Sequence, residues 1–317
     1  MKVQEIFERI IERGIKADVR GKKGIDEALK QVKKDYEKLP KERQKYFDTE
    51  KLTNPFDDSR ILHIAGNGDV KDMIVGIDVE VQDLLLADRL REKGNNIDLV
   101  VSHHPVGKAV MTFPGVMRIQ ADLHNKLGVP IHIAEALIEE REKEVGRRVL
   151  VGNSERITDA AKYLGLSLIC THTPADNSVT DFLQKLFDKK KPRLVGDIID
   201  ILYEIPEYRM AAQNNCPPKV FAGSENRRAG RIFVDMTGGT TGNKKSLEKL
   251  SAAGVGTIVG MHIPDEHREE AEKHSMNVVI AGHISSDTLG MNLVLDAAVK
   301  GTKVKVHEFS GFRRVER

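Results

Sequence analysis

The sequence predicts an α/β protein with two lobes, in which mixed or parallel sheets are flanked by helices and preceded by a helical N-terminal extension. From about residue 60 onward, short apolar segments of strand length alternate with amphipathic segments of helix length. This alternation is typical of parallel strands, because each parallel connection needs a long crossover. Polar residues gather directly after several of the apolar segments, which is where α/β folds bind ligands.

The composition is that of a globular protein without a charge bias. The 317 residues are 40% hydrophobic and 31% charged, and 50 basic residues nearly balance 48 acidic ones. The resulting net charge of +2 gives no reason to expect a nucleic-acid or membrane partner. Two unpaired cysteines, Cys170 and Cys216, argue against a disulfide framework and against thiolate zinc sites. Without a signal-peptide pattern or a long apolar run, the expected localisation is cytoplasmic.

Residues 1–55 are expected to form the helical N-terminal extension. Apolar residues recur there at helical spacing in two sets, which Gly14 and the segment 21–24 separate. Asn54 and Pro55 mark a turn at its end. The many charges of this region are expected on solvated helix faces.

The two α/β lobes are expected over residues 56–190 and 191–317. In the first lobe, the pattern predicts strands or short apolar stretches at 60–65, 73–78, 98–101, 130–133, 148–151 and 166–170, and helices at 81–93, 116–127, 134–145, 154–164 and 178–189. In the second lobe, it predicts strands at 231–235, 256–260, 277–281 and 304–309, and helices at 246–253, 264–274 and 286–300. The last strand alternates polar and apolar residues, which is typical of a sheet edge.

Three of the predicted strands end in histidines. His103 and His104 follow the strand at 98–101, and the next residue is a proline that ends the strand. Neighbouring side chains on a strand point to opposite faces, so two adjacent histidines can reach one site only where the strand ends. His172 follows the stretch at 166–170, with Asp176 four residues later. His283 and Asp287 repeat that spacing after the strand at 277–281.

A metal centre and a purely structural role are both open for these segments. Asp176 could cap a helix beginning near Ser178, and Ser285 or Asp287 could cap the helix after the last strand. Together, however, the three segments offer imidazoles and carboxylates without sulfur, which favours Zn²⁺, Mn²⁺ or Fe²⁺ at an open catalytic site. The number of ligands exceeds what one tetrahedral ion needs. We therefore expect two divalent ions bridged by a carboxylate, an arrangement typical of hydrolytic enzymes.

Several weaker signals surround this set. The glycine-rich segment 238–242 lies between a strand and a helix, and it could cradle an anion or form a plain tight turn. His262 and His267 follow the strand at 256–260 and could contact the substrate or support the ligands. Asp78 could touch the centre or belong to a turn, whereas Cys170 is expected in the core.

At these residues the chain resembles the NGG-interacting factor three family, whose members are also described as dinuclear metal-centre hexameric proteins or, for some, as type two GTP cyclohydrolase I. The resemblance extends from about residue 55 to 310 and rests on the segments 75–78, 102–105, 172–176, 238–242 and 282–287, together with His267. It implies a toroidal homo-hexamer with paired metal ions in a cleft. It also implies the metal ligands, which match His103, His104, Asp176, His283 and Asp287.

The chain departs from the family pattern at three places. The last ligand position holds Asp287, where the family usually has Glu. About 70 residues separate the double histidine from His172, which is longer than usual and suggests an inserted strand–helix unit near 134–165. The N-terminal helical extension is also additional.

These observations predict a dinuclear metal-dependent hydrolase that acts on a nucleotide-like or phosphorylated small molecule through a metal-activated water. A GTP cyclohydrolase-like activity would fit this chemistry. His267 is the expected acid or base, and His172, Gly238 and Gly239 are expected to contact the substrate. The alternative is a non-catalytic metal-binding or regulatory scaffold in the form of a ring. In either case the expected partner is the chain itself.

Overall fold

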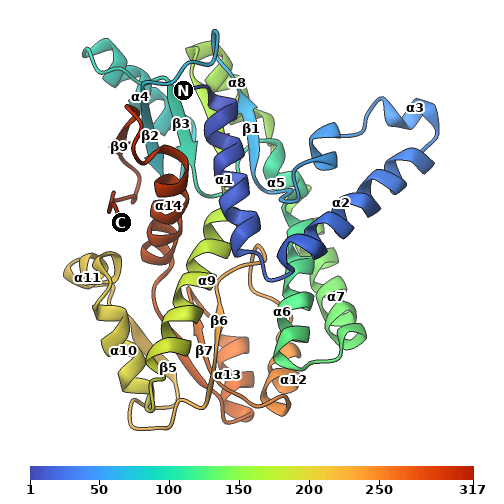
Figure 1. Cartoon of the computed structure of the whole chain (residues 1–317), viewed down its shortest axis with the longest axis vertical. Coiled ribbons are helices and arrows are strands. Elements are labelled where there is room, and N and C mark those ends of the chain that lie inside the picture. The colour runs from blue at the N-terminus through green and yellow to red at the C-terminus, as the bar shows by residue number, and fades with distance from the viewer.

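Two mixed β-sheets with helices on their faces form the protein, which confirms the predicted α/β class (Figure 1). The structure is a computed structural model that describes residues 1–317 throughout. The first sheet has the order β1-β4-β3-β2-β9, and the second has the order β5-β8-β7-β6. No helix is both long enough and apolar enough to cross a membrane.

The first sheet aligns the carboxyl ends of three parallel strands. Its members are β1 (Arg60–His63), β4 (Ser167–Cys170), β3 (Leu99–Ser102), β2 (Asp72–Gly76) and β9 (Lys305–Glu308), and only β1 runs antiparallel to its neighbour. Ser102 pairs with Gly76 on one side and with Cys170 on the other. The residues that follow β2, β3 and β4 therefore leave the sheet at the same edge. The edge position predicted for the last strand is confirmed, since β9 pairs only with β2.

Helices cover both faces of this sheet because alternate strand residues are apolar on both sides. Val75, Val101 and Ile169 pack into one cluster with α1 (Val3–Ala17), α9 (Thr173–Lys190) and α14 (His283–Val299). The intervening strand residues pack against α4 (Val81–Glu92) and α8 (Glu155–Leu164) on the other face. The residues of the candidate site therefore extend from a sheet whose two faces are both covered by helices.

The second sheet contains three parallel strands and one antiparallel edge strand. They are β6 (Arg231–Asp235), β7 (Val255–Gly260), β8 (Asn277–Ile280) and the antiparallel β5 (Lys219–Ala222). One face packs against α6 (Ile119–Leu127), α7 (Ile131–Val149), α12 (Ser246–Ala252) and α13 (Asp265–Lys273). The other packs against α9, α10 (Val195–Tyr203) and α11 (Pro206–Gln213). Because α9 contributes to the core of both sheets, it links them.

Helices α9 and α14 approach each other closely next to the site. A Cβ atom on Gly290 of α14 would lie 2.6 Å from the carbonyl oxygen of Ala175 on α9, so only glycine allows this crossing. Gly14 likewise allows α1 to approach α9 closely, because a Cβ atom at this position would lie 2.7 Å from Pro174. The three helices therefore pack almost backbone to backbone beside Asp176.

The N-terminal helices divide into a packed part and a projecting part. α1 is held by buried apolar residues such as Ile6 and Ile10. In α2 (Gly21–Lys38) only Ile25 is buried, and together with α3 (Lys41–Gln44) it projects from the body of the molecule (Figure 1). A short helical turn, η1 (Thr49–Leu52), leads back to β1.

Several predicted elements were wrong. The apolar stretches at 130–133 and 148–151 are the two ends of the single helix α7, so the segment near 134–165 contains the helices α7 and α8 and no strand. A short apolar run fits either structure, and packing of one helix face against η2 (Phe113–Arg118) and α6 decides for the helix here. The predicted helix at 116–127 begins within η2. The sequence pattern did not indicate α5 (Lys108–Thr112), α10, α11 or β5.

Candidate metal centre

Backbone hydrogen bonds hold both adjacent histidines at the edge of the first sheet. The amide of His103 donates to the carbonyl of Gly76 at 2.9 Å, and that of His104 donates to Ile77 at 3.0 Å. These bonds continue the ladder between β2 and β3 for two residues beyond the strand end. The chain direction, and with it the placement of the two rings, is thus set by the sheet.

The two aspartates come from the first turns of the linking helices. α9 begins at Thr173 and α14 at His283, which places Asp176 and Asp287 inside the helices. His172 and Gly282 occupy the N-cap positions, and neither helix has a side-chain cap. The capping roles considered for Asp176, Ser285 and Asp287 are therefore wrong. The spacing of four residues places His283 and Asp287 on one face of α14.

The side chains predicted as ligands converge on two carboxylates. Nε2 of His103 lies 3.4 Å from Asp287 Oδ1 and 3.5 Å from Asp176 Oδ1. Asp287 Oδ2 lies 3.5 Å from Nε2 of His104 and also 3.5 Å from Nε2 of His283. Segments more than a hundred residues apart in the chain therefore meet in one cluster.

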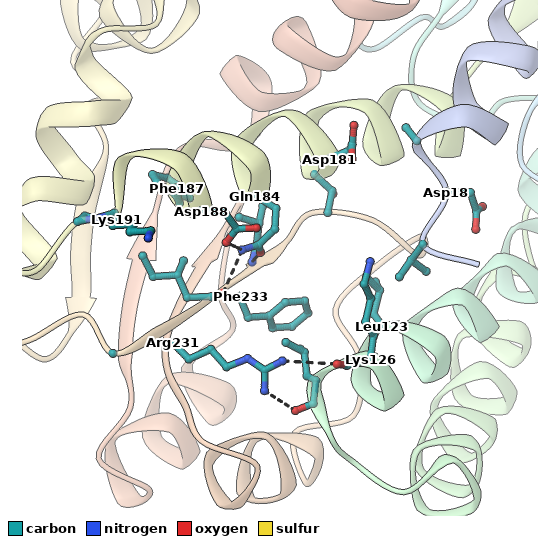
Figure 2. A pocket seen from close by; sticks show the side chains of 18 of the residues that line it. Asp18, Leu123, Lys126, Asp181, Gln184, Phe187, Asp188, Lys191, Arg231 and Phe233 are labelled. Carbon is teal, nitrogen blue, oxygen red and sulfur yellow. Dashed lines mark hydrogen bonds between the residues drawn. The ribbon is translucent and has the colours of Figure 1, made fainter. Parts of the chain in front are cut away.

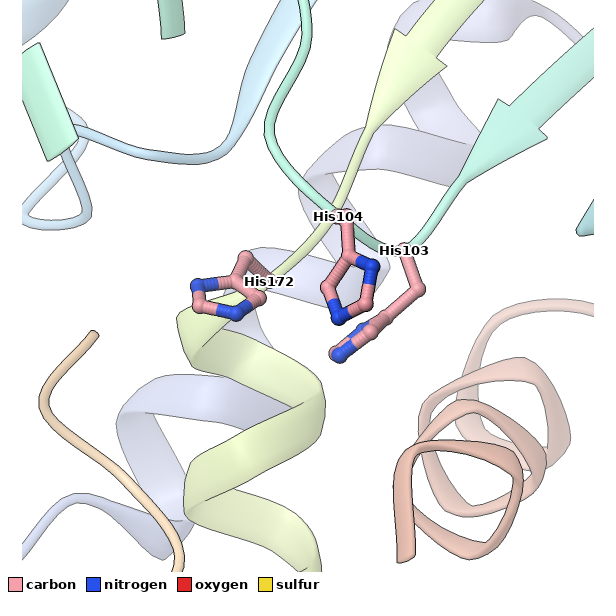
Figure 3. Close-up of side chains that lie close together, drawn as sticks. All are labelled: His103, His104 and His172. Carbon is pink, nitrogen blue, oxygen red and sulfur yellow. The ribbon is translucent and has the colours of Figure 1, made fainter. Parts of the chain in front are cut away.

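His172 belongs to the same cluster. Its Nε2 lies 3.5 Å from Asp176 Oδ2, and its ring centroid is 5.0 Å from that of His103. Figure 3 shows the rings of His103, His104 and His172 directed toward a common space at the ends of β3 and β4. The side chain of His172 is only 7% exposed, which leaves it little surface for a substrate. It belongs to one of the groups of side chains that could hold a metal ion.

The second nitrogen of each of these rings is bound by an oxygen acceptor. Nδ1 of His103 donates to the carbonyl of Thr171 at 3.2 Å, and Nδ1 of His104 donates to Asp78 at 2.7 Å. Nδ1 of His172 donates to Asp58 at 2.8 Å. In the neutral rings the Nε2 atoms therefore carry lone pairs. A hydrogen bond from the second nitrogen to a carboxylate or carbonyl is also what orients histidine ligands of metal ions.

The donor set fits a divalent cation. Asp176 and Asp287 are buried, and Asp176 Oδ1, both oxygens of Asp287 and Nε2 of His103 have no hydrogen-bond partner. These atoms are all acceptors in the neutral-ring state, so another group with positive charge is needed between them. Tetrahedral ligands at about 2.05 Å from an ion lie about 3.3 Å from one another, close to the separations of 3.4–3.5 Å observed here. The buried His and Asp groups could therefore hold a metal.

Three overlapping groups of these residues have ligand atoms that lie within 4.8 Å of one another. They are His103, His104 and His172; His104, His283 and Asp287; and His103, Asp176 and Asp287. Because Asp287 belongs to two of the groups and offers a different oxygen to each, it is placed to bridge them.

The pKa shifts within the cluster indicate which of its groups hold protons. Burial raises the pKa of Asp176 well above its usual range, and the nearby charge of Asp287 adds to the rise. Burial also acts to raise the pKa of Asp287, but the surrounding histidines outweigh it and hold that pKa below the usual range. Burial acts to lower the pKa of His104, but the nearby charge of Asp287 and the hydrogen bond to Asp78 outweigh burial and raise the pKa to about 9. A proton on His104 thus balances the charge of Asp287.

The predicted acid or base, His267, lies apart from the ligand atoms. Its Nε2 donates to the carbonyl of Gly242 at 3.0 Å, and its Nδ1 is buried without a partner. His262 is nearer, with its ring centroid 5.0 Å from that of His283 and its Nδ1 3.4 Å from the hydroxyl of Thr241. Burial lowers the pKa of both His262 and His267, so both rings are neutral at neutral pH.

The glycine-rich turn packs against α6 and η2 beside the cluster. Gly238 has a φ of +88°, and its carbonyl accepts a hydrogen bond from the Gln120 amide at 2.7 Å. Gly239 has a φ of +85° and lies against Phe113, whose ring centroid is 5.6 Å from that of His172. The turn therefore lies at the side of the cluster, and its conformation requires glycine.

Asp58 is the functional residue that the sequence did not indicate. It is fully buried and accepts hydrogen bonds from His172 Nδ1 and from the Thr173 hydroxyl, the latter at 2.7 Å. Burial alone would raise its pKa, but the hydrogen bond and the charge of His172 outweigh burial and lower it. The only local signal is an acidic pair just before β1, which is common on protein surfaces. Asp78, considered from its place after β2, binds His104.

Other proteins of known structure share the fold of this chain. The sequence matches no protein-family model and no curated protein. It is similar to a NIF3 superfamily protein from Sphaerobacter thermophilus, with 24% identity over 96% of this chain and 98% of that chain and a TM-score of 0.72. It is also similar to reduced HcgD from Methanocaldococcus jannaschii, with 14% identity over 84% of this chain and 94% of that chain and a TM-score of 0.52.

NIF3 abbreviates NGG-interacting factor three, the family whose motifs the sequence resembles. The similarity to the Sphaerobacter protein extends over nearly the full length of both chains. The predicted resemblance is thereby confirmed at the level of the fold, and this chain has the fold of the NIF3 superfamily.

Proposed function

We propose that this protein is a dinuclear metal-dependent hydrolase of a nucleotide-like or phosphorylated small molecule. The observation that supports it is the convergence of four imidazoles and two buried carboxylates whose facing atoms lack hydrogen-bond donors. Burying two carboxylates in this way is costly for a fold that has no cation to place there. A structural role alone does not account for such a set.

The two ions would share Asp287. His104, His283 and Asp287 Oδ2 would hold one ion, and His103, Asp176 and Asp287 Oδ1 would hold the other. We add His172 to this second group because its Nε2 faces Asp176. Divalent ions such as Zn²⁺, Mn²⁺ or Fe²⁺ would supply Lewis acidity, which makes hydrolysis near neutral pH possible. The aspartate at position 287 has a shorter reach than glutamate, and the observed distances indicate that its two oxygens still reach both groups.

The surrounding side chains would position the substrate and move protons. His262 and His267 are neutral at neutral pH and can each accept a proton. His262 is the better placed of the two, because its ring centroid lies 5.0 Å from that of His283. The turn containing Gly238 and Gly239 would form one wall of the substrate site, since it packs beside Phe113 and the cluster.

Metal analysis followed by an activity screen tests this proposal. Protein purified without added ions should contain two equivalents of metal per chain, and His104→Ala should lose them. The metal-loaded protein should then hydrolyse a member of a panel of nucleotides and phosphoesters, GTP included. The variants His262→Gln and His267→Gln should both keep the metal. Whichever of the two histidines transfers the proton, its variant should lose the activity. Bound metal without turnover of any substrate would instead support the non-catalytic metal-binding scaffold.

We also propose that the chain assembles as a homo-hexamer. Large apolar side chains are exposed on the single chain, among them Val151 at 89% and Tyr163 at 93%. The family resemblance implies a hexameric ring, and subunit interfaces in such a ring would cover side chains of this kind. Mass photometry should give six times the chain mass of 35.4 kDa. A particle of any other size would contradict the ring.

A further inference from the structure

A second cavity lies away from the metal cluster. It has a volume of about 640 Å³ and is bounded by α9, α6, the edge strand β6 and the turn that follows α1 (Figure 2). None of the cluster residues lines it. Its volume lies within the range of small-molecule sites. The proposed hydrolase chemistry does not involve it.

Basic side chains without carboxylate partners line this cavity. They are Lys16, Lys126, Lys191 and Arg231, and none of them forms an ion pair within the chain. Arg231 donates to the carbonyl of Leu127 at 2.7 Å, which holds its guanidinium at one wall. Lys126 and Lys191 stand on opposite sides of the space (Figure 2). The cavity therefore presents positive charge from several directions.

The carboxylates of the cavity do not cancel this charge. Asp18 binds the Arg20 guanidinium at 2.8 Å, and Asp181 binds Lys185 at 2.7 Å. Only Asp188 has no cationic partner, and it accepts a hydrogen bond from the Gln184 amide at 3.0 Å. A surplus of positive charge thus remains, which favours an anionic ligand.

The wall of the cavity also offers an unused hydroxyl and apolar surface. Thr180 is only 9% exposed, and its Oγ1 has no hydrogen-bond partner. A helical threonine commonly bonds to the carbonyl one turn earlier, so a buried and unpartnered hydroxyl is unusual. Leu127 and Ile232, which are half-buried, add apolar surface to the lining of the cavity. The ligand should therefore have an apolar part as well as a charged group.

A peptide strand is not the expected occupant, although β6 is an edge strand. Gln184 donates its amide to the carbonyl of Ile232 at 3.3 Å and accepts from the amide of Val234 at 3.1 Å. The backbone groups that an added strand would need are therefore already bound. Recognition in this cavity must come from the side chains.

We propose that this cavity binds a small phosphomonoester with an apolar organic group. The lysines and Arg231 attract the phosphate, since ammonium and guanidinium groups are common phosphate ligands in proteins. The Thr180 hydroxyl donates a hydrogen bond to it, and the organic group contacts Leu127 and Ile232. Binding at this site is independent of the metal ions, because the two sites share no residue.

Calorimetric titration of the full chain with 1-naphthyl phosphate in the presence of EDTA tests the proposal. The compound should bind more tightly than either inorganic phosphate or 1-naphthol. The double variant Lys126→Gln/Lys191→Gln should bind about tenfold more weakly or worse, and so should Thr180→Val, because hydrogen bonds to charged groups are the strong ones. Lys189→Gln is the matched control, since Lys189 lies two residues before Lys191, is exposed and does not line the cavity.

The possible results separate this site from the metal centre. The His104→Ala variant should bind 1-naphthyl phosphate like the parent protein. If His104→Ala abolishes binding, or if the cavity variants bind like the parent while circular dichroism shows them folded, the proposal is overturned. Equal affinity for inorganic phosphate would overturn the role of the apolar lining, and equal affinity for 1-naphthol would overturn the role of the cations. None of these results depends on whether the protein is a hydrolase.

Discussion

Replacing Asp176 with Asn should stabilise the metal-free protein and at the same time abolish metal binding at the group it belongs to. Asp176 is 3% exposed, and its Oδ1 has no hydrogen-bond partner. Burial raises its pKa well above the usual value of 3.8, so the ionised form opposes folding at neutral pH. An asparagine of the same shape carries no charge, and its amide can donate to Nε2 of His103, which lies 3.5 Å from Asp176 Oδ1.

The expected increase in the free energy of unfolding follows from the usual cost of burying a polar group without a hydrogen-bond partner. That cost is about 1–3 kcal/mol. For a chain of this size, each kcal/mol raises the melting temperature by about 2 °C, so the metal-free variant should melt about 2–6 °C higher than the parent. A carboxyl group with a raised folded-state pKa costs stability above its unfolded-state value and not below it. The advantage of the variant should therefore disappear as the pH falls below 3.8.

Scanning calorimetry with and without metal measures both effects. When metal is present, the parent protein should have the higher melting temperature, because metal binding stabilises only the parent. Asp181→Asn is the control, since that aspartate lies on the same helix, is 23% exposed and pairs with Lys185. A metal-free Asp176→Asn protein that melts below the parent, or one that keeps the parent's metal content, would refute the reasoning.

Three further predictions concern the proton balance, the buried support and the turn. Metal affinity should rise with pH up to about 9, because His104 must release a proton held with that pKa; an affinity independent of pH by calorimetric titration would contradict this. Without metal, the same raised pKa stabilises the fold fully below 6.5 and no longer above about 9. Asp58→Asn should weaken metal binding about 10- to 100-fold, because His172 loses the hydrogen bond that orients its ring. Competition with a chelator measures this change. An unchanged dissociation constant for the metal would remove His172 from the ligands. Gly238→Ala should lower the free energy of unfolding in urea by more than Gly254→Ala does. Both glycines have a φ near +90°, but only a Cβ atom at position 238 would meet a neighbour, at 2.5 Å. Equal losses of free energy in the two variants would count against tight packing of the turn.

The residues of the candidate metal centre could be recognised from the sequence because each lies in or just after a segment that follows a predicted strand. The polar residues at 103–104, 172–176 and 283–287 interrupt apolar runs at the position where parallel strands end. Strand ends of one parallel sheet meet at the same edge, so their convergence follows from the fold class. The spacing of four residues between His283 and Asp287 also placed them on one helix face before the helix itself was known.

The partners of these residues could not be predicted in the same way. Asp58 contacts a histidine 114 positions further along the chain, and nothing in its neighbourhood distinguishes it from a surface carboxylate. The capping interpretation of Asp176 failed because α9 begins at Thr173, five residues before the predicted start. Helix boundaries depend on tertiary packing, and here α1 and α14 pack against the first turn of α9.

The sequence by itself determined the α/β class, the positions of the strand ends and the kind of chemistry that their histidines and aspartates can support. It did so because these properties depend on periodicity and residue type within short segments. Only the tertiary structure decided that the stretches at 130–133 and 148–151 belong to one helix, that the last strand returns to the first sheet, and which carboxylate faces each imidazole. Those outcomes depend on contacts between distant segments, whose free energies come from burial and are not encoded in any local pattern.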